Sequence, residues 1–192
     1  MTMNEERSKA APGPLALVQT LVNTQYGQGR RVHVELTSPE QLRAWLVAHQ
    51  LLEDGTAVMQ GDFRRVLLLR EALRSLVRAN NEGEVPASQV EVFNRLASDA
   101  PLTVRLHPDG LPTLSPDIAG VDGVIARLVG IVFTAMTDGT WARLKACRND
   151  RCQKAFYDTS KNRSGAWCSM AVCGSRLKAR AYRHRHTAHR EG

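Results

Sequence analysis

The chain has 192 residues, 43% of them hydrophobic, which is enough for one ordinary domain or for one domain with a small module. Its 26 Lys and Arg against 19 Asp and Glu give a formal net charge of +7. The N-terminus is charged and then rich in Pro and Gly, unlike a signal peptide, and the longest charge-free apolar run late in the chain, residues 128–137, is far shorter than the ~20 residues of a membrane helix. We therefore expect neither a secreted nor a membrane protein, and we place the chain in the cytoplasm.

The first elements are short. Residues 1–14 are polar or small and interrupted by prolines, so we expect a disordered leader. Residues 15–22 turn apolar and predict a first helix, which the Gly-Gln-Gly segment at 27–29 ends. Residues 31–36 alternate apolar and polar side chains, which predicts a short strand.

A strong helix start follows at residues 38–41, Ser-Pro-Glu-Gln. The serine hydroxyl can accept from backbone N–H groups, proline suits the first helical position, and Gln41 can complete a capping box. The helix then carries one stripe at helical spacing, made of Leu42, Trp45, Leu46 and His49.

Two more helices are predicted next. Asp62 can act as the N-cap of a third helix, which runs to about Asn80. Its buried stripe consists of aliphatic side chains at helical spacing: Val66, Leu69, Leu73, Leu76 and Val77. A fourth helix is marked by Val90, Phe93, Leu96 and Ala97.

A hairpin and a long apolar helix complete the first domain. Residues 103–106 and 113–114 flank a turn at 107–110, where Asp-Gly is a hairpin signal. Residues 117–138 are nearly all apolar and predict a helix central to the core, ended by Gly139.

Residues 15–139 therefore form one predicted domain, and the fold class we predict is α+β, mainly α, with a small β-hairpin or sheet. Its three histidines are scattered without metal-ligand spacing, and no phosphate-binding or nucleophile motif occurs, so we expect no enzyme. The third helix also carries a basic edge: Arg64, Arg65, Arg70, Arg74 and Arg78. We expect a solvated face there, with capture of an anionic ligand as the alternative.

All four cysteines lie in the last quarter of the chain, at Cys147, Cys152, Cys168 and Cys173. The spacing C-x4-C-x15-C-x4-C gives two close pairs, which is typical of a four-thiolate zinc site. Disulfides would need an oxidising compartment, and free or redox-active thiols are the remaining alternative. We predict one structural Zn²⁺ held by all four cysteines, which leaves no open position for catalysis.

The basic character of the chain belongs to this module. Residues 143–192 hold 13 Lys and Arg against 3 Asp and Glu, while residues 1–142 are mildly acidic. The second cysteine pair opens a helix with a narrow apolar stripe and charged flanks, which can lie across or into the DNA major groove. A solvated basic helix that balances the zinc–thiolate charge is the alternative. We expect phosphate or base contacts from Arg163, Arg176, Lys178, Arg180, Arg183 and Arg185.

The segment DTSKNRSGAWCSMAVCGSRLKARAYRHR, residues 158–185, resembles the CGNR zinc finger. The resemblance covers residues 143–187 and implies zinc ligands at the four cysteines, in a treble-clef-like knuckle followed by a basic helix, with residues 188–192 as a tail. Upstream, Val22-Asn23-Thr24, the segment SPEQLRAWL at 38–46 and LREALR at 69–74 resemble the ABATE domain. Ser175 stands where the family has Asn, and Gly165-Ala166 where basic residues are usual.

This resemblance implies a stress-related transcription regulator whose finger binds DNA and whose N-terminal domain senses a ligand or mediates assembly. A small-molecule effector is therefore a further expected partner, and a membrane is not. Charge alone does not separate DNA from RNA, so an RNA-binding or ribosome-associated module stays open. A protein-interaction adaptor, in which the acidic first domain masks the basic finger, is the third alternative.

Overall fold

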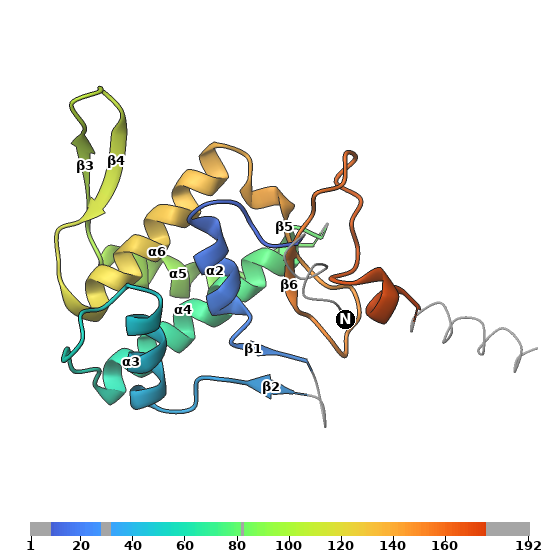
Figure 1. Ribbon diagram of the computed structural model, residues 1–192, viewed down its shortest axis with the longest axis horizontal. Helices are drawn as coiled ribbons and strands as arrows, with labels where there is room; N and C mark the ends of the chain where they lie inside the picture. Colours follow the sequence, from blue (N-terminus) through green and yellow to red (C-terminus); the bar gives the residue numbers. More distant parts are fainter. Residues whose placement is uncertain (1–8, 28–31, 82, 176–192) are drawn as a thin grey trace, which may run out of the picture.

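The computed structural model describes residues 9–27, 32–81 and 83–175, and its elements are labelled as in Figure 1. The described α-helices are α2 (Leu15–Val22), α3 (Pro39–Ala48), α4 (Gln60–Ala79), α5 (Ala87–Ser98) and α6 (Gly120–Thr137). The described strands are β1 (Gln25–Tyr26), β2 (His33–Val34), β3 (Leu102–Leu106), β4 (Pro112–Pro116), β5 (Leu144–Ala146) and β6 (Ala155–Tyr157). They pair as three separate antiparallel hairpins, β1–β2, β3–β4 and β5–β6. The predicted class, mainly α within α+β with a zinc finger, is confirmed.

Helix α4 is the centre of the core and contacts α2, α3, α5 and α6. Its predicted stripe is confirmed, because Val66, Leu69, Leu73 and Val77 are fully buried and Leu76 packs against them partly buried. Helix α6 crosses this core as the long apolar helix that the sequence predicts. It is the one described helix that could span a membrane by length and composition, and here it packs against the other helices.

The helix ends follow local hydrogen bonding, with two corrections. Ser38 caps α3 as predicted, accepting from the Gln41 N–H at 3.4 Å, but the Gln41 side chain accepts from the backbone N–H of Thr37 instead of closing a box with Ser38. Asp62 is not the N-cap of α4. It lies in the first turn, and its carboxylate accepts from the N–H of the actual cap residue, Met59, at 2.9 Å.

The first hairpin differs from the prediction. Among the described residues, the expected strand at 31–36 covers only His33–Val34. Its partner strand, Gln25–Tyr26, was not predicted, because two residues next to the glycines at 27–29 are too few to show an alternating pattern. Of the alternating apolar side chains, only Leu36 is buried, whereas Val34 is exposed. Alternation predicted a strand here, but tertiary packing left it a short ribbon at the edge of the fold.

The second hairpin, β3–β4, is longer than predicted and projects from the body of the molecule (Figure 1). The Asp-Gly turn is confirmed, with Gly110 at a φ of 82° and its N–H donating to the carbonyl of His107 at 2.8 Å. The base of the hairpin packs on α6 at Gly130, where a Cβ would lie 3.5 Å from the Leu102 side chain and 3.6 Å from that of Leu114.

Residues 9–14, which we expected to belong to a disordered leader, instead make specific contacts with the rest of the chain. The Lys9 carbonyl accepts from the Tyr157 N–H at 2.9 Å, and the Lys9 ammonium lies 4.8 Å from the centre of the Phe156 ring. Ala11 is buried in the core. Backbone contact with β6 therefore fixes a segment whose composition alone suggests disorder.

Asparagine side chains join the third hairpin to the helices. The Asn23 amide, directly after α2, pairs with both backbone groups of Ala155, accepting from its N–H at 2.7 Å and donating to its carbonyl at 3.0 Å. At the end of α4, Asn80 donates to the Leu144 carbonyl at 2.9 Å, and Asn81 donates to the Ala146 carbonyl at 2.7 Å. Both outer edges of the hairpin thus find the partners that edge strands otherwise lack.

We predict that Asn23→Ala lowers the free energy of unfolding by about 2 kcal/mol, because it leaves the N–H of Ala155 without its partner at a part-buried position. Urea denaturation of the zinc-loaded protein measures the change. Asn94→Ala on the exposed face of α5 is the control and should change stability little. Equal losses in the two variants would contradict the role of Asn23.

Candidate metal centre

The four cysteines come from two separate segments that the fold brings together. Cys147 directly follows β5, and Cys152 ends the turn after it. Cys168 lies between Trp167 and a helical turn, Met170–Gly174, that contains Cys173. The four sulfur atoms all lie within 4.8 Å of one another, as the spacing predicts.

The cluster fits one tetrahedral zinc ion. The Cys152 and Cys168 sulfurs lie 3.6 Å apart, and the Cys168 and Cys173 sulfurs 3.7 Å apart. Four sulfurs at about 2.3 Å from a central zinc would be separated by about 3.8 Å, so the spacing matches thiolates around a metal and not a disulfide. Four protein ligands close such a site, so the metal has a structural role.

Local hydrogen bonds hold the first cysteine pair in a tight turn. The Cys147 N–H donates to the Lys154 carbonyl at 2.9 Å, and the Cys152 N–H donates to the Asn149 carbonyl at 2.7 Å. The Arg148 N–H donates to the Ala166 carbonyl, which ties this turn to the segment that carries the second pair. The backbone thus sets the ligand positions.

The thiols influence one another's ionisation strongly. Hydrogen bonds from Cys147 and Cys168 lower the pKa of Cys152 to about 2. The hydrogen bond to Cys152 raises the pKa of Cys147 to about 12, and the pKa of Cys168 is raised by its thiol neighbours as well. Four thiolates this close need a cation between them, which is the charge that Zn²⁺ supplies when bound.

The helical turn after Cys168 explains the small residues of the motif. Buried Ser169 caps the turn by accepting from the Val172 N–H at 3.3 Å. A Cβ on Gly174 would lie 2.9 Å from the Met170 sulfur and 3.2 Å from the Trp167 ring, so a larger residue here would require these side chains to shift. Ser175, where the family has Asn, donates from its hydroxyl to the Met170 carbonyl at 3.2 Å.

A buried ion pair organises the loop between the two cysteine pairs. The Lys145 ammonium on β5 lies 3.0 Å from the carboxylate of Asp158, whose side chain is only 2% exposed. That carboxylate also accepts from the N–H groups of Ser160 at 3.0 Å and Gly165 at 2.8 Å. Lys145 further donates to the Arg163 carbonyl, so one charge pair fixes both ends of the loop.

The loop contacts set the ionisation of Asp158. Burial alone would raise the pKa of this carboxyl, but hydrogen bonds from Ser160, Lys145 and Gly165 prevail and lower its pKa to about 2 from 3.8. The folded state therefore favours the charged form. The resulting stabilisation is present at neutral pH and is lost as the pH falls from about 4 toward 2.

Gly165 lies against the same carboxylate. A Cβ at this position would lie 2.5 Å from Oδ1 of Asp158. A basic side chain, which the family pattern has here, would need the loop to move away from its anchor. This departure from the pattern therefore agrees with the packing around Asp158.

One of the six predicted nucleic-acid contacts can be placed. Arg163 is exposed on the loop described above, in a left-handed backbone conformation with a φ of 52°. The other five lie outside the described residues: Arg176, Lys178, Arg180, Arg183 and Arg185. Arg151 and Lys161 are also exposed in this region and are further candidates for nucleic-acid contacts. The sequence patterns did not indicate them, because net charge does not distinguish them from other surface cations.

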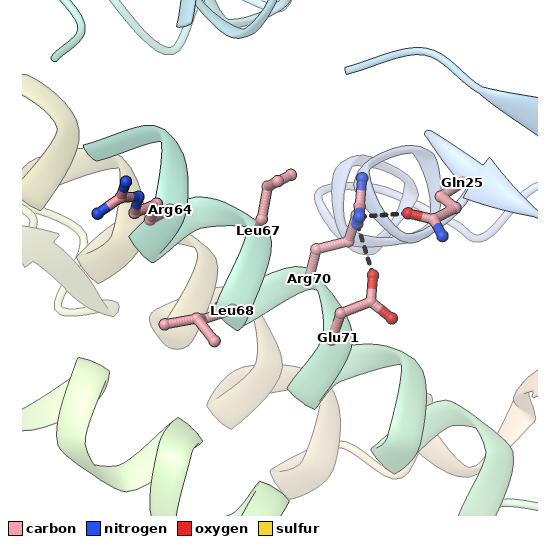
Figure 2. Close-up of a pocket in the computed structure, with 6 residues that line it drawn as sticks. All are labelled: Gln25, Arg64, Leu67, Leu68, Arg70 and Glu71. Atoms are coloured by element: carbon pink, nitrogen blue, oxygen red, sulfur yellow. Dashed lines mark hydrogen bonds and ion pairs between the residues drawn. The ribbon is translucent and has the colours of Figure 1, made fainter. Parts of the chain in front are cut away.

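A second feature lies on α4, at its predicted basic edge. A solvated face was the wrong expectation for two of these arginines, because Arg70 is 4% exposed and its neighbour Arg74 is largely buried as well. Arg70 donates to Glu71 and to Gln25 on β1, as Figure 2 shows, and burial lowers the pKa of Arg74. These guanidinium groups fasten the segment after α2 to the centre of the core.

A shallow cavity of about 480 Å³ lies beside these groups (Figure 2). Its lining residues are Gln25, Arg64, Leu67, Leu68, Arg70 and Glu71. The Arg70 donors are engaged with protein groups, whereas Arg64 is exposed and makes no ion pair among the described residues. The cavity thus combines apolar walls with one accessible cation.

Comparison with known proteins finds two matching family models. Residues 15–135 match the ABATE family, described as "Putative stress-induced transcription regulator", and residues 143–186 match the CGNR zinc finger. No curated protein sequence matches the chain significantly. The first match covers more than half of the chain, and the second contains all four cysteines.

We predict that Asp158→Asn lowers the free energy of unfolding by about 3 kcal/mol, because it leaves the buried Lys145 ammonium without its counter-charge. Urea denaturation of the zinc-loaded protein measures this loss. Asp150→Asn removes an exposed carboxylate from the same module and should cost little. A neutral effect of Asp158→Asn would show that the ion pair does not hold the loop.

Proposed function

Because the chain belongs to the ABATE family and carries a CGNR zinc finger, we propose that it binds DNA through the finger and regulates transcription in the cytoplasm. The proposal depends on one observation above all. The cysteine cluster joins two segments of the chain, and exposed cations lie on the loops between the cysteines. Neither matched family description names a reaction, which agrees with a role in binding.

Cations on the described loops support a polyanion partner. Arg151 lies within the turn between the first two cysteines, and Lys161 and Arg163 lie on the loop anchored by Asp158. None of these three side chains forms an ion pair with a described carboxylate. We propose that these cations add to the positive charge of the C-terminal sequence and that phosphate or base contacts come from Arg163, Arg176, Lys178, Arg180, Arg183 and Arg185.

The domain contacts argue against the adaptor alternative. We propose a division into residues 15–139 and 143–187, with 188–192 as a tail. Across this boundary the described side-chain contacts include hydrogen bonds from the neutral amides of Asn23, Asn80 and Asn81, and the Lys154 ammonium over the Tyr26 ring at 5.5 Å. Arg151, Lys161 and Arg163 form no ion pair with a described carboxylate of the first domain, although masking of these cations would require such pairs. RNA remains the competing polyanion.

We predict that the affinity of the zinc-loaded protein for duplex DNA falls steeply with salt. Contacts to ~5 phosphates give a slope of log K against log[salt] near −4 to −5. Arg163→Gln should reduce the magnitude of this slope by about 0.9, because one phosphate contact is lost. Fluorescence anisotropy across a salt series measures both quantities.

The matched control is Arg95→Gln, which removes an exposed cation on α5 and should leave the slope unchanged. Cys168→Ser, which breaks the metal site, should abolish binding. A flat salt dependence would overturn the proposal. Tighter binding to structured RNA than to duplex DNA in competition would replace DNA with RNA as the partner.

For the first domain, we propose that the cavity on α4 receives an anionic effector with an apolar body. Arg64 offers the charge, and Leu67 and Leu68 offer the apolar wall. We predict that benzoate, used as a probe, raises the melting temperature of the protein but not that of Arg64→Gln. Arg78→Gln, an exposed arginine on the same helix, should keep the response. No shift with benzoate in the unmodified protein would count against this site.

A further inference from the structure

The β3–β4 hairpin carries an apolar face that the rest of the described chain covers only at its base. Its register pairs Leu102 with Pro116, Val104 with Leu114, and Leu106 with Pro112, so one face of the hairpin is wholly apolar. The opposite face carries the polar pairs Thr103 with Ser115 and Arg105 with Thr113. We call the hairpin the arm.

The base of the apolar face is covered, and its outer half is exposed. Leu102 and Leu114 pack against α6 at Gly130. Farther out, Val104 is 63% exposed and Leu106 73%, and Figure 1 shows the arm extending away from the helices. The arm alternates regularly between apolar and polar pairs, and exposing its apolar face to water is energetically unfavourable for an isolated molecule.

Helix α6 adds to this surface. Phe133 lies three residues after Gly130 and therefore on the same side of the helix, and its side chain is 60% exposed. Leu111 at the tip of the arm is 63% exposed. We call Val104, Leu106, Leu111 and Phe133 the arm patch.

The terminal segments of this chain are poorly suited to cover the arm patch. Residues 1–8 and 176–192 are dominated by polar and basic side chains. The described chain begins and ends beside the finger, whereas the arm projects from the other end of the molecule (Figure 1). An anionic lipid surface is also a poor match, because the tip carries Asp109 and the one arginine of the arm, Arg105, is paired with Asp117 at 2.8 Å.

We propose that the arm patch is a dimer interface, in which the arm of each molecule packs over the arm patch of a second copy. A twofold interface needs only one self-complementary patch, and here the apolar face of the arm packs on the side of α6 that carries an exposed aromatic ring. The four side chains offer roughly 500 Å² of surface, against the about 800 Å² that each partner contributes to a standard interface. Both strands of the arm are sheet edges, so neighbouring backbone can complete the contact.

The dimer develops the assembly role within the proposed function. Two copies would present two fingers and would read two half-sites in one DNA duplex. The interface itself does not depend on DNA, and its test therefore uses protein alone.

The experiment is sedimentation equilibrium of the full-length, zinc-loaded protein across the micromolar range, without nucleic acid. We expect twice the chain mass of 21.2 kDa. Leu106→Asp and Phe133→Asp should each raise the dimer dissociation constant by about 100-fold, because each places a charge in the apolar contact. Val104→Thr nearly keeps the side-chain shape and serves as a third variant in case an Asp variant does not fold. It should also raise the dimer dissociation constant.

The matched control is Val34→Asp, since Val34 is a 44% exposed apolar residue on β2 outside the arm patch. This variant should keep the dimer. A monomeric mass for the unmodified protein throughout the range would overturn the proposal, and so would a dimer that survives all three arm-patch substitutions. Loss of DNA binding with an intact dimer would instead count against the proposed function and leave this interface standing.

Discussion

The finger depends on hydrogen bonds that asparagine side chains of the first domain make to a hairpin of two three-residue strands. Such a hairpin cannot satisfy its own outer backbone groups, and a small module has little core with which to hold them. Asn23 pairs with Ala155 on one edge, and Asn80 and Asn81 donate to the other edge. The ends of α2 and α4 therefore support the β5–β6 hairpin of the finger, while the same helices form part of the core of the first domain.

The position of the metal centre therefore depends on the segments around it. Cys147 follows directly from β5, so the strand that α4 holds sets the position of the first ligand. The Lys145–Asp158 pair then fixes the loop that leads to the second cysteine pair. The four thiolates that would hold zinc come from both segments, so metal binding and the meeting of these segments are coupled.

The two proposed activities lie at opposite ends of the molecule. The cysteine cluster and its cations are at one end, and the projecting arm is at the other, with α6 and α4 between them (Figure 1). Helix α4 also connects the cavity beside Arg64 to the finger, because its first half lines the cavity and Asn80 follows its last turn. The proposed effector site and the DNA-binding module thus share α4, and the arm packs on α6, which contacts α4, so the three sites have a physical route for coupling.

Local spacing and side-chain chemistry were enough to predict several features from the amino-acid sequence. These include the four zinc ligands, the Ser38 cap, the α4 stripe and the Asp-Gly hairpin, because side-chain period, turn residues and thiol spacing act over a few positions. The burial of Arg70, the role of Asp158 and the contacts of Lys9 became evident only from the packing of the folded chain. Each of these depends on partners distant in sequence: Arg70 meets Thr24 and Gln25, Asp158 meets Lys145 across a hairpin, and Lys9 meets Tyr157. A polar side chain has the same local pattern whether it is solvated or buried with a partner, so its role is settled only when packing brings that partner to it.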